Sequence, residues 1–210
     1  VGPLDATYQD ERGTDWNDNA VRFGALSKAA ALLGSGASPL GWRPDVVHCH
    51  DWPAGLACAY LRHAQEPRAA SVMTVHNIAF QGNFDPALLP TLELPRSSFT
   101  VEGLEFYGRL SFLKAGLACA DALATVSPTY AREIQTAEYG CGMDGLLRHR
   151  AASLAGILNG IDTQAWDPQT DRWIRENYDA ATLERKSANK AELQRRLGLE
   201  RGEDVPLFGV

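Results

Sequence analysis

The sequence predicts an α/β fold built on a parallel β-sheet with helices on both faces. Three observations lead to this class. Several short runs are apolar along their whole length, which is typical of strands buried on both faces. Helical segments separate these runs, as the crossover connections of a parallel sheet require. Polar residues follow most of the apolar runs directly, which is where ligands bind in sheets of this kind.

The strands are expected where apolar and β-branched residues cluster between turn signals. The predicted strands are residues 45–48, 70–75, 122–126, 154–158 and 205–210. The polar residues that follow the first four strands are His50 and Asp51, His76 and Asn77, Ser127, and Asn159. We therefore expect these side chains to converge on one edge of the sheet.

The helices are expected where apolar residues recur at helical spacing or where caps mark a start or an end. The predicted helices are residues 17–33, a segment that runs from about Pro53 through Leu61, 104–120, and 183–197. Ser127 and Pro128 predict the N-cap and first residue of a further helix. Gly198 is expected to end the last helix. Residues 1–18 and 77–100 are rich in turn-forming residues and are predicted to be irregular.

Composition excludes several classes of partner. The 210 residues carry a formal net charge of −6, with an isoelectric point of about 5.4. Lys and Arg form no basic stripe in the sequence, so we expect no nucleic-acid partner. No apolar run approaches the ~18 residues that span a bilayer, and no leader is recognisable at the start, so no membrane partner is expected. The four cysteines show no CxxC spacing, which favours free thiols in a reducing cytoplasm.

The segment DVVHCHDWPAGL, residues 45–56, raises the question of a metal site. His48 and His50 alternate along a strand and share one face, whereas Cys49 points the opposite way. No HExxH or paired CxxC supplies further ligands, so no metal is expected and His48 is interpreted as a hydrogen-bonded core histidine. Trp52 next to Asp51 offers an aromatic face beside a carboxylate, a pairing that suits a sugar. That interpretation and simple packing of the indole both remain open.

Other chemistries have weaker signals. Ser127 lies between a strand and a helix but lacks the flanking glycines of a hydrolase nucleophile, so it is interpreted as a cap. Residues 140–145, GCGMDG, follow no strand and are interpreted as a loop that enters a helix at Asp144. Phosphate binding by the backbone of that loop stays open. Trp16 and Trp42 are interpreted as loop residues that cover the edge of the core.

An ordered set of segments resembles the bacterial glycogen synthase family, the retaining glycosyltransferases that use ADP-glucose to make glycogen or starch. The segments are VVHCHDWPAGL, TVHNIAFQG, GLEFYGRLSFLKAGLACAD, TVSPTYAREI, GCGMDGLL, GILNGID followed by WDP, and NKAELQRRLGL followed by PLFGV. The resemblance covers nearly the whole chain in order. No single segment decides it, but several long ones in register make a chance match very improbable.

The resemblance implies an architecture called GT-B, in which two Rossmann-like domains face a deep cleft. Residues 1–200 resemble the later part of the N-terminal domain plus the interdomain linker, and residues 201–210 resemble the first strand of the C-terminal domain. The chain is thus expected to be truncated at both ends. The cations that stabilise the leaving phosphate would belong to the C-terminal domain, so this chain alone is expected to be inactive.

The resemblance also assigns roles to residues. Asp51 and His76 match family positions close to the transferred glucose and are expected to be catalytic. The expected substrate-binding residues are Tyr8, Trp52, Asn77 and Asn159. The family usually has histidine after the His-Asp-Trp motif, where this chain has Pro53. This departure puts the handling of the acceptor in doubt.

The implied reaction transfers glucose from ADP-glucose to the non-reducing end of an α-1,4-glucan with retention of configuration, without a cofactor, metal ion or assigned protein nucleophile. Two alternatives stay open. The first is another GT-B enzyme, such as a sucrose- or trehalose-type synthase with a different nucleotide-sugar. The second is a non-catalytic glucan-binding module. The oligomeric state does not follow from the sequence.

Overall fold

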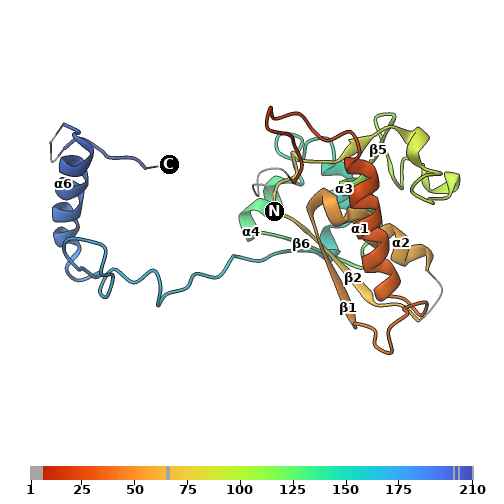
Figure 1. Cartoon of the computed structure of the whole chain (residues 1–210), viewed down its shortest axis with the longest axis horizontal. Coiled ribbons are helices and arrows are strands. Elements are labelled where there is room, and N and C mark those ends of the chain that lie inside the picture. The colour runs from red at the N-terminus through yellow and green to blue at the C-terminus, as the bar shows by residue number, and fades with distance from the viewer. Residues whose placement is uncertain (1–6, 65–66, 201, 203, 210) are drawn as a thin grey trace. The chain divides into compact units, whose positions relative to one another are not determined.

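The computed structural model describes residues 7–64, 67–200, 202 and 204–209. The chain divides into two compact units, residues 1–159 and residues 160–210. The first unit contains the sheet and most helices (Figure 1), and the second contains one long helix. The predictions for residues 1–6 lie outside the described residues.

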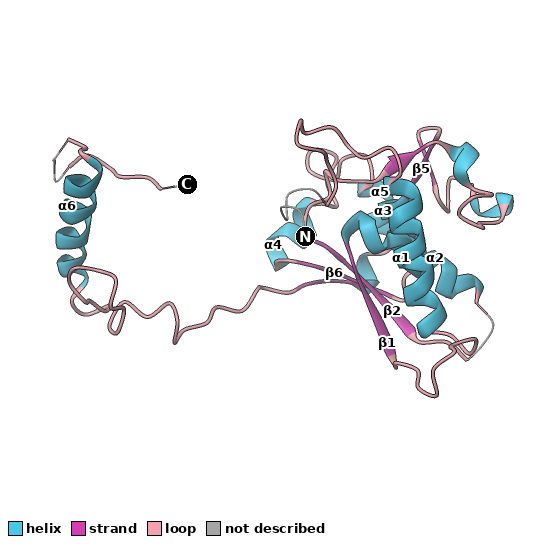
Figure 2. Cartoon of the chain, viewed as in Figure 1, coloured by secondary structure: helices cyan, strands magenta, loops and turns pink. Residues whose placement is uncertain are grey.

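The first unit is built on a four-stranded parallel sheet, which confirms the predicted α/β class (Figure 2). Its strands, in spatial order, are β1 (Val46–His50), β2 (Ala70–Val75), β6 (Ala122–Thr125) and β7 (Leu154–Gly156). The first three match their predicted positions within two residues. The fourth ends two residues earlier than predicted, because Ile157 makes a single backbone bond to Thr125 and the chain then leaves the sheet.

The strand register aligns the carboxyl ends of the strands. His50 of β1 pairs with Thr74 of β2, and Val75 of β2 pairs with Thr125 of β6. The residues that follow these strands therefore emerge at the same edge of the sheet. This is the arrangement that the polar strand ends predicted.

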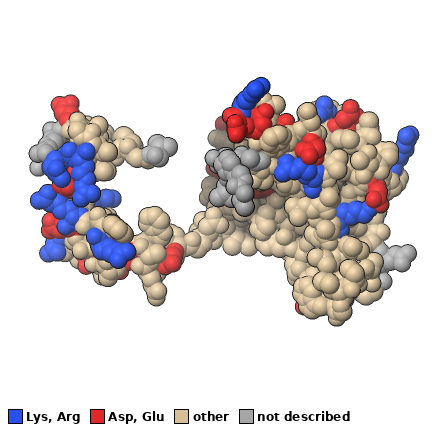
Figure 3. Space-filling view, in the orientation of Figure 1, with Lys and Arg blue, Asp and Glu red and all other residues tan. Residues whose placement is uncertain are grey.

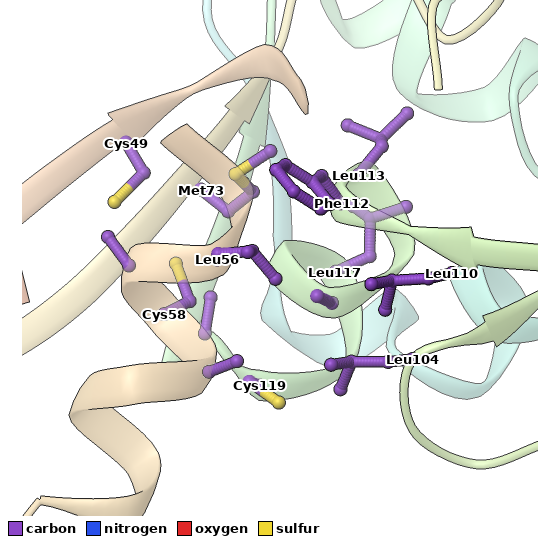
Figure 4. Close-up of a cluster of buried hydrophobic side chains, with 14 of the residues drawn as sticks. Cys49, Leu56, Cys58, Met73, Leu104, Leu110, Phe112, Leu113, Leu117 and Cys119 are labelled. Carbon is purple, nitrogen blue, oxygen red and sulfur yellow. The ribbon is translucent and has the colours of Figure 1, made fainter. Parts of the chain in front are cut away.

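One face of the sheet packs on helices. Cys49 of β1 and Met73 of β2 are at most 2% exposed and lie in the main hydrophobic cluster (Figure 4). Leu123 of β6, 1% exposed, belongs to the same cluster. On the opposite face of β1, Val46 and His48 are exposed. The interpretation of His48 as a core histidine is therefore wrong. His48 is hydrogen-bonded but lies on the solvent side, because strand alternation places it opposite Cys49.

Two helices form the helical side of this core, α2 (Asp51–His63) and α3 (Phe112–Cys119). They approach each other closely at glycines. A Cβ atom added to Gly55 would lie 2.0 Å from the carbonyl oxygen of Phe112, and one added to Gly116 would lie 3.1 Å from the Cα of Gly55. A third helix, α1 (Asn19–Leu33), packs against α2, and the two are joined where the Ser27 hydroxyl donates to the carbonyl of Pro53.

The predicted helix over residues 104–120 is wrong in its first half. The structure has a hairpin of β4 (Glu105–Phe106) and β5 (Arg109–Ser111), and α3 begins only at Phe112. The two residues between the strands, Tyr107 and Gly108, both have positive φ angles, 48° and 77°. Such a two-residue turn matches the twist of a hairpin and cannot continue a helix. β5 also pairs with β3 (Asn83–Phe84), inside the stretch predicted to be irregular.

The capping predictions are confirmed. Ser127 accepts a hydrogen bond from the backbone N–H of Tyr130 at 2.9 Å, and Pro128 is the first residue of α4 (Pro128–Glu133). The GCGMDG loop leads into α5 (Asp144–His149) as expected. Short 3₁₀ turns complete the unit at Pro86–Leu88, Arg96–Ser98 and Ala151–Ser153.

The second unit contains a 3₁₀ turn, Leu183–Arg185, followed by α6 (Lys186–Leu197). Gly198 ends α6 in the left-handed conformation with φ 66°, as predicted. Basic side chains gather on α6 (Figure 3), where Glu192 pairs with Arg195 and Arg196. The described residues 205–209 form no strand, and Val210 lies outside the described residues. A strand needs a neighbour for its backbone groups, and none of the described segments pairs with this one.

Candidate functional site

Asp51 ties together the carboxyl ends of β1 and β2. It is the first residue of α2, and its carboxylate accepts the backbone N–H of His76 at 2.8 Å and that of Asn77 at 3.5 Å. Its φ angle is +52°, a left-handed conformation that Asp and Asn tolerate better than most residues. The sharp change from strand to helix thus places the carboxylate over the start of the loop that follows β2.

Three histidines lie side by side at this edge. The rings of His48 and His50 are 4.2 Å apart, and Nδ1 of His50 lies 2.9 Å from Nε2 of His76. Partial burial lowers the pKa of His50, and the charges of His48 and His76 lower it further, whereas Asp51 raises it. A lowered pKa favours the neutral form of His50. In the described part of the chain, no group of three His, Cys, Asp or Glu residues is arranged to hold a metal ion.

Trp52 forms the centre of an aromatic wall. Its ring centroid lies 4.8 Å from that of Phe23 and 5.7 Å from that of Tyr8. On the other side it contacts Phe84 at 5.8 Å and Phe112 at 6.4 Å. Trp52 thus links the N-terminal loop, α1, β3 and the buried start of α3. The indole packs on the core and also lines the cleft.

A cleft of about 720 Å³ opens beside this wall. Its lining residues are Tyr8, Gln9, Asp15, Trp16, Asn19, Asp51, Trp52, Pro53, Asn77, Ala79, Phe80, Gln81, Gly82, Asn83 and Phe84. This volume is in the range typical of small-molecule sites. Among the described residues that line it there is no Lys or Arg, so this part of the cleft is polar and aromatic.

Four of the six predicted site residues line this cleft, namely Tyr8, Asp51, Trp52 and Asn77. His76 is not part of the lining but joins it through its bonds to Asp51 and His50. Asn159 is exposed and has no hydrogen bond among the described residues. The structure does not bring it to the other five, because β7 is separated from β1 by two strands. Pro53 lines the cleft as the third residue of α2, within its first turn.

Several other lining residues were not predicted from the sequence. Trp16 lines the cleft rather than covering a core edge, and its backbone N–H donates to the carbonyl of Tyr8. The amide of Asn19 donates to the same carbonyl at 2.8 Å, which fixes the Tyr8 loop on α1. Trp42 is 63% exposed, so the prediction that it covers the core edge is wrong. Asn83 enters through β3, and Gln81 lies two residues before it; β3 has no sequence signal of its own because it is only two residues long.

A second hollow, of about 760 Å³, lies on the other side of α3 and has a structural explanation. Lys114 is buried there, and its ammonium donates to the carbonyls of Val101 and Glu105. Burial lowers the pKa of Lys114, while Glu105 and Glu102 raise it. Arg150 donates to the carbonyls of Leu117 and Ala120 at the end of α3. These cations hold a loop and cap a helix.

A parallel α/β sheet with an aromatic and polar cleft at its carboxyl edge defines a small-molecule-binding domain of the Rossmann-like class. The model of one family, the starch synthase catalytic domain, matches residues 3–149, and the chain belongs to this family. No helix among the described residues is long and apolar enough to cross a membrane.

Individual relatives agree with this family. The glycogen synthase of Aromatoleum aromaticum is 56% identical over 203 residues, which cover 97% of this chain and 41% of that protein. The glycogen synthase of Nitrosomonas europaea is 54% identical over 201 residues, which cover 96% of this chain and 41% of that protein. The chain thus spans about two fifths of the length of these relatives.

A solved structure has the same fold. The catalytic domain of starch synthase IV from Arabidopsis thaliana, bound to ADP and acarbose, superimposes with a TM-score of 0.73 at 31% identity. The match covers 89% of this chain and 39% of that chain.

Proposed function

We propose that this chain is part of a glycogen or starch synthase, a retaining glycosyltransferase that moves glucose from ADP-glucose to the non-reducing end of an α-1,4-glucan. The observation that carries the proposal is the cleft in which Trp52 and Tyr8 present aromatic faces beside the polar groups of Asp51 and Asn77. Membership of the starch synthase catalytic domain family supports it, as do the glycogen synthase relatives.

The charge of the cleft agrees with a site in which this chain binds the sugar and another part of the protein binds the diphosphate. Because its lining carries no Lys or Arg, this half of the site suits a neutral sugar better than a diphosphate. The cations that stabilise the departing diphosphate would come from the part of the protein beyond this chain. We place residues 1–200 in the N-terminal domain and linker of a GT-B enzyme, and residues 201–210 at the start of its C-terminal domain.

We assign the residues as follows. Asp51 and His76 act at the transferred glucose, where a carboxylate and an imidazole at the end of neighbouring strands stabilise positive charge on the anomeric carbon and orient hydroxyls. The residues that bind substrate are Tyr8, Trp52, Asn77 and Asn159. Asn159 reaches the sugar only if the segment after β7 moves toward the cleft. The reaction needs no cofactor, and the enzyme acts in the cytoplasm.

The complete synthase tests the proposal. We expect it to incorporate glucose from ADP-glucose into glycogen, and to use UDP-glucose much less well. Asp51→Ala and His76→Ala should each lower kcat by about 10²-fold or more. His63→Ala is the matched control, because His63 is exposed at the far end of α2.

Three results would contradict parts of the proposal. A preference for UDP-glucose would point to another nucleotide-sugar synthase. Glycogen binding without any transfer by the complete protein would point to a glucan-binding module. Near-normal turnover in both alanine variants would remove Asp51 and His76 from the reaction. The 210-residue chain by itself is expected to incorporate no glucose.

A further inference from the structure

His50, the last residue of β1, contacts the ring of His76 but does not line the cleft. Its Nδ1 lies 2.9 Å from Nε2 of His76, and the two ring centroids are 5.2 Å apart. His50 pairs with Thr74 in the strand register, so its backbone position is set by the sheet. The backbone of His76 is held as well, since its N–H donates to Asp51 at 2.8 Å. His76 is thus fixed at two points, once through its main chain and once through its ring.

His48 supports His50 from behind. The two rings are 4.2 Å apart and inclined by 33°, and Nε2 of His48 lies 2.7 Å from the hydroxyl oxygen of Thr74. Thr74 is buried, and the side chain between the two histidines, Cys49, is buried on the opposite face of β1. This row of side chains leaves His50 little freedom to turn away from His76.

The contact between the two imidazoles restricts where protons can lie. A neutral imidazole carries one N–H, so one of the two facing nitrogens must donate and the other must accept. If both rings were protonated, both facing nitrogens would be donors and the contact would be lost. The protonation patterns of His50 and His76 are therefore coupled. The other ring nitrogen of His76, Nδ1, has no hydrogen-bond partner among the described residues.

We propose that His50 is a positioning residue for His76, because it fixes the ring orientation and tautomer of His76 and leaves Nδ1 as the nitrogen that meets the bound sugar. The role of Nδ1 of His76 in contacting a sugar rests on the proposed function. The contact between His50 and His76 is present in the 210-residue chain and can be tested there. Partial burial lowers the pKa of His50, which agrees with a neutral imidazole at this place.

The first test reads the imidazole nitrogens of the 210-residue chain by long-range ¹H–¹⁵N correlation near neutral pH. We expect His76 to show two well-separated ring nitrogen shifts, the signature of one fixed tautomer. In His50→Ala the two shifts should move together, as in an imidazole that exchanges freely between tautomers. His50→Asn keeps a short side chain with a donor and an acceptor near the position of Nδ1 and should restore part of the separation.

The control is His63→Ala, which should leave the His76 shifts unchanged and also identifies one of the five histidine signals. Amide spectra show whether each variant is folded. If His50→Ala does not fold, His50→Asn decides the matter alone, because it should keep a fixed tautomer with altered shifts. Identical His76 shifts in wild type and in the folded His50 variants would overturn the proposal.

The second test uses the complete synthase. We expect His50→Ala to lower kcat by about 10-fold with little change in KM for ADP-glucose, and His50→Asn to recover part of the loss. The pH profile of kcat should shift in His50→Ala, which a purely structural defect would not cause. Positioning would be contradicted if both variants changed kcat and KM to the same extent and the pH profile of kcat did not shift. If His76→Ala were fully active, the proposed role of His76 would fail, while the nitrogen shifts would still decide whether His50 fixes its tautomer.

Discussion

The carboxylate of Asp51 accepts the backbone N–H of His76 at 2.8 Å, which joins the first residue of α2 to the end of β2. Two parallel strands are thereby tied together beyond their last ladder bond. Asp51, proposed as a catalytic residue, therefore also stabilises the fold of this chain. Its effect on folding and its effect on turnover must be measured separately.

The contribution of Asp51 to stability can be tested by two substitutions. Asp51→Ala removes the acceptor and places a residue without a local hydrogen bond at φ +52°, so it should lower the free energy of unfolding by about 1–3 kcal/mol. Asp51→Asn keeps an acceptor and tolerates the left-handed conformation, so we expect a loss of under about 1 kcal/mol. Urea denaturation of the 210-residue chain measures both. Equal losses in the two variants would show that the bond to His76 is not what matters.

Gly82 makes room for the aromatic wall. Its φ angle is +58°, and a Cβ atom there would lie 2.6 Å from Cε3 of Trp52. We expect Gly82→Ala to cost about 2–4 kcal/mol of stability, the sum of backbone strain and a clash with the indole. Gly108→Ala is the control, since Gly108 has φ +77° and open space around it. It should show only the strain, about 1 kcal/mol. Similar losses at the two glycines would argue against the close approach to Trp52.

Gly55 sets the distance between α2 and α3. Because its Cβ atom would lie 2.0 Å from a backbone carbonyl, Gly55→Ala should lower the free energy of unfolding by about 3 kcal/mol or more. Gly145→Ala, in the exposed part of α5, meets only an arginine side chain at 3.9 Å. It should raise stability by about 0.5–1 kcal/mol through helix propensity. Chemical denaturation of both variants separates the two effects, and a mild cost at Gly55 would mean that the helices can move apart.

Asp121 should contribute to acid sensitivity. The Arg68 guanidinium, together with hydrogen bonds from Ser71, holds the pKa of Asp121 well below its usual range. A carboxylate with a lowered pKa in the folded state stabilises the protein above its unfolded pKa, and this contribution is lost as the pH falls below about 4. We expect the unfolding free energy of Asp121→Asn to fall less steeply than that of wild type between about pH 5 and pH 2. Parallel curves over that range would contradict this.

The sequence predicted the elements whose signals are local. The apolar runs of β1, β2 and β6, the cap at Ser127 and the stop at Gly198 each depend on residues within a few positions. The hairpin at Tyr107 was not predicted, because an apolar stretch of that length fits a helix as well. The only local sign of the turn is the Tyr-Gly pair. The segment 205–209 reads as a strand, yet a strand forms only where a partner supplies its hydrogen bonds.

The residues of the candidate site that lie at strand ends could be predicted from the sequence. The rule that polar residues at the ends of parallel strands converge brought Asp51, His76 and Asn77 together correctly. It failed for Asn159, since the chain leaves β7 early and the residue stays exposed. The wall around Trp52 could not be predicted. Its partners Phe23, Phe84 and Phe112 are far apart in the sequence, and only tertiary packing brings them to one place.

Because Trp52 contacts the fully buried Phe112, the aromatic wall of the cleft is continuous with the protein interior. A substitution at Phe112 touches no ligand, yet it would tilt the indole on which a sugar ring is expected to lie. Affinity for glucan and resistance to unfolding should therefore change together across variants of this aromatic group. A substitution that reshapes the cleft at Trp52 should therefore also change the stability of the chain.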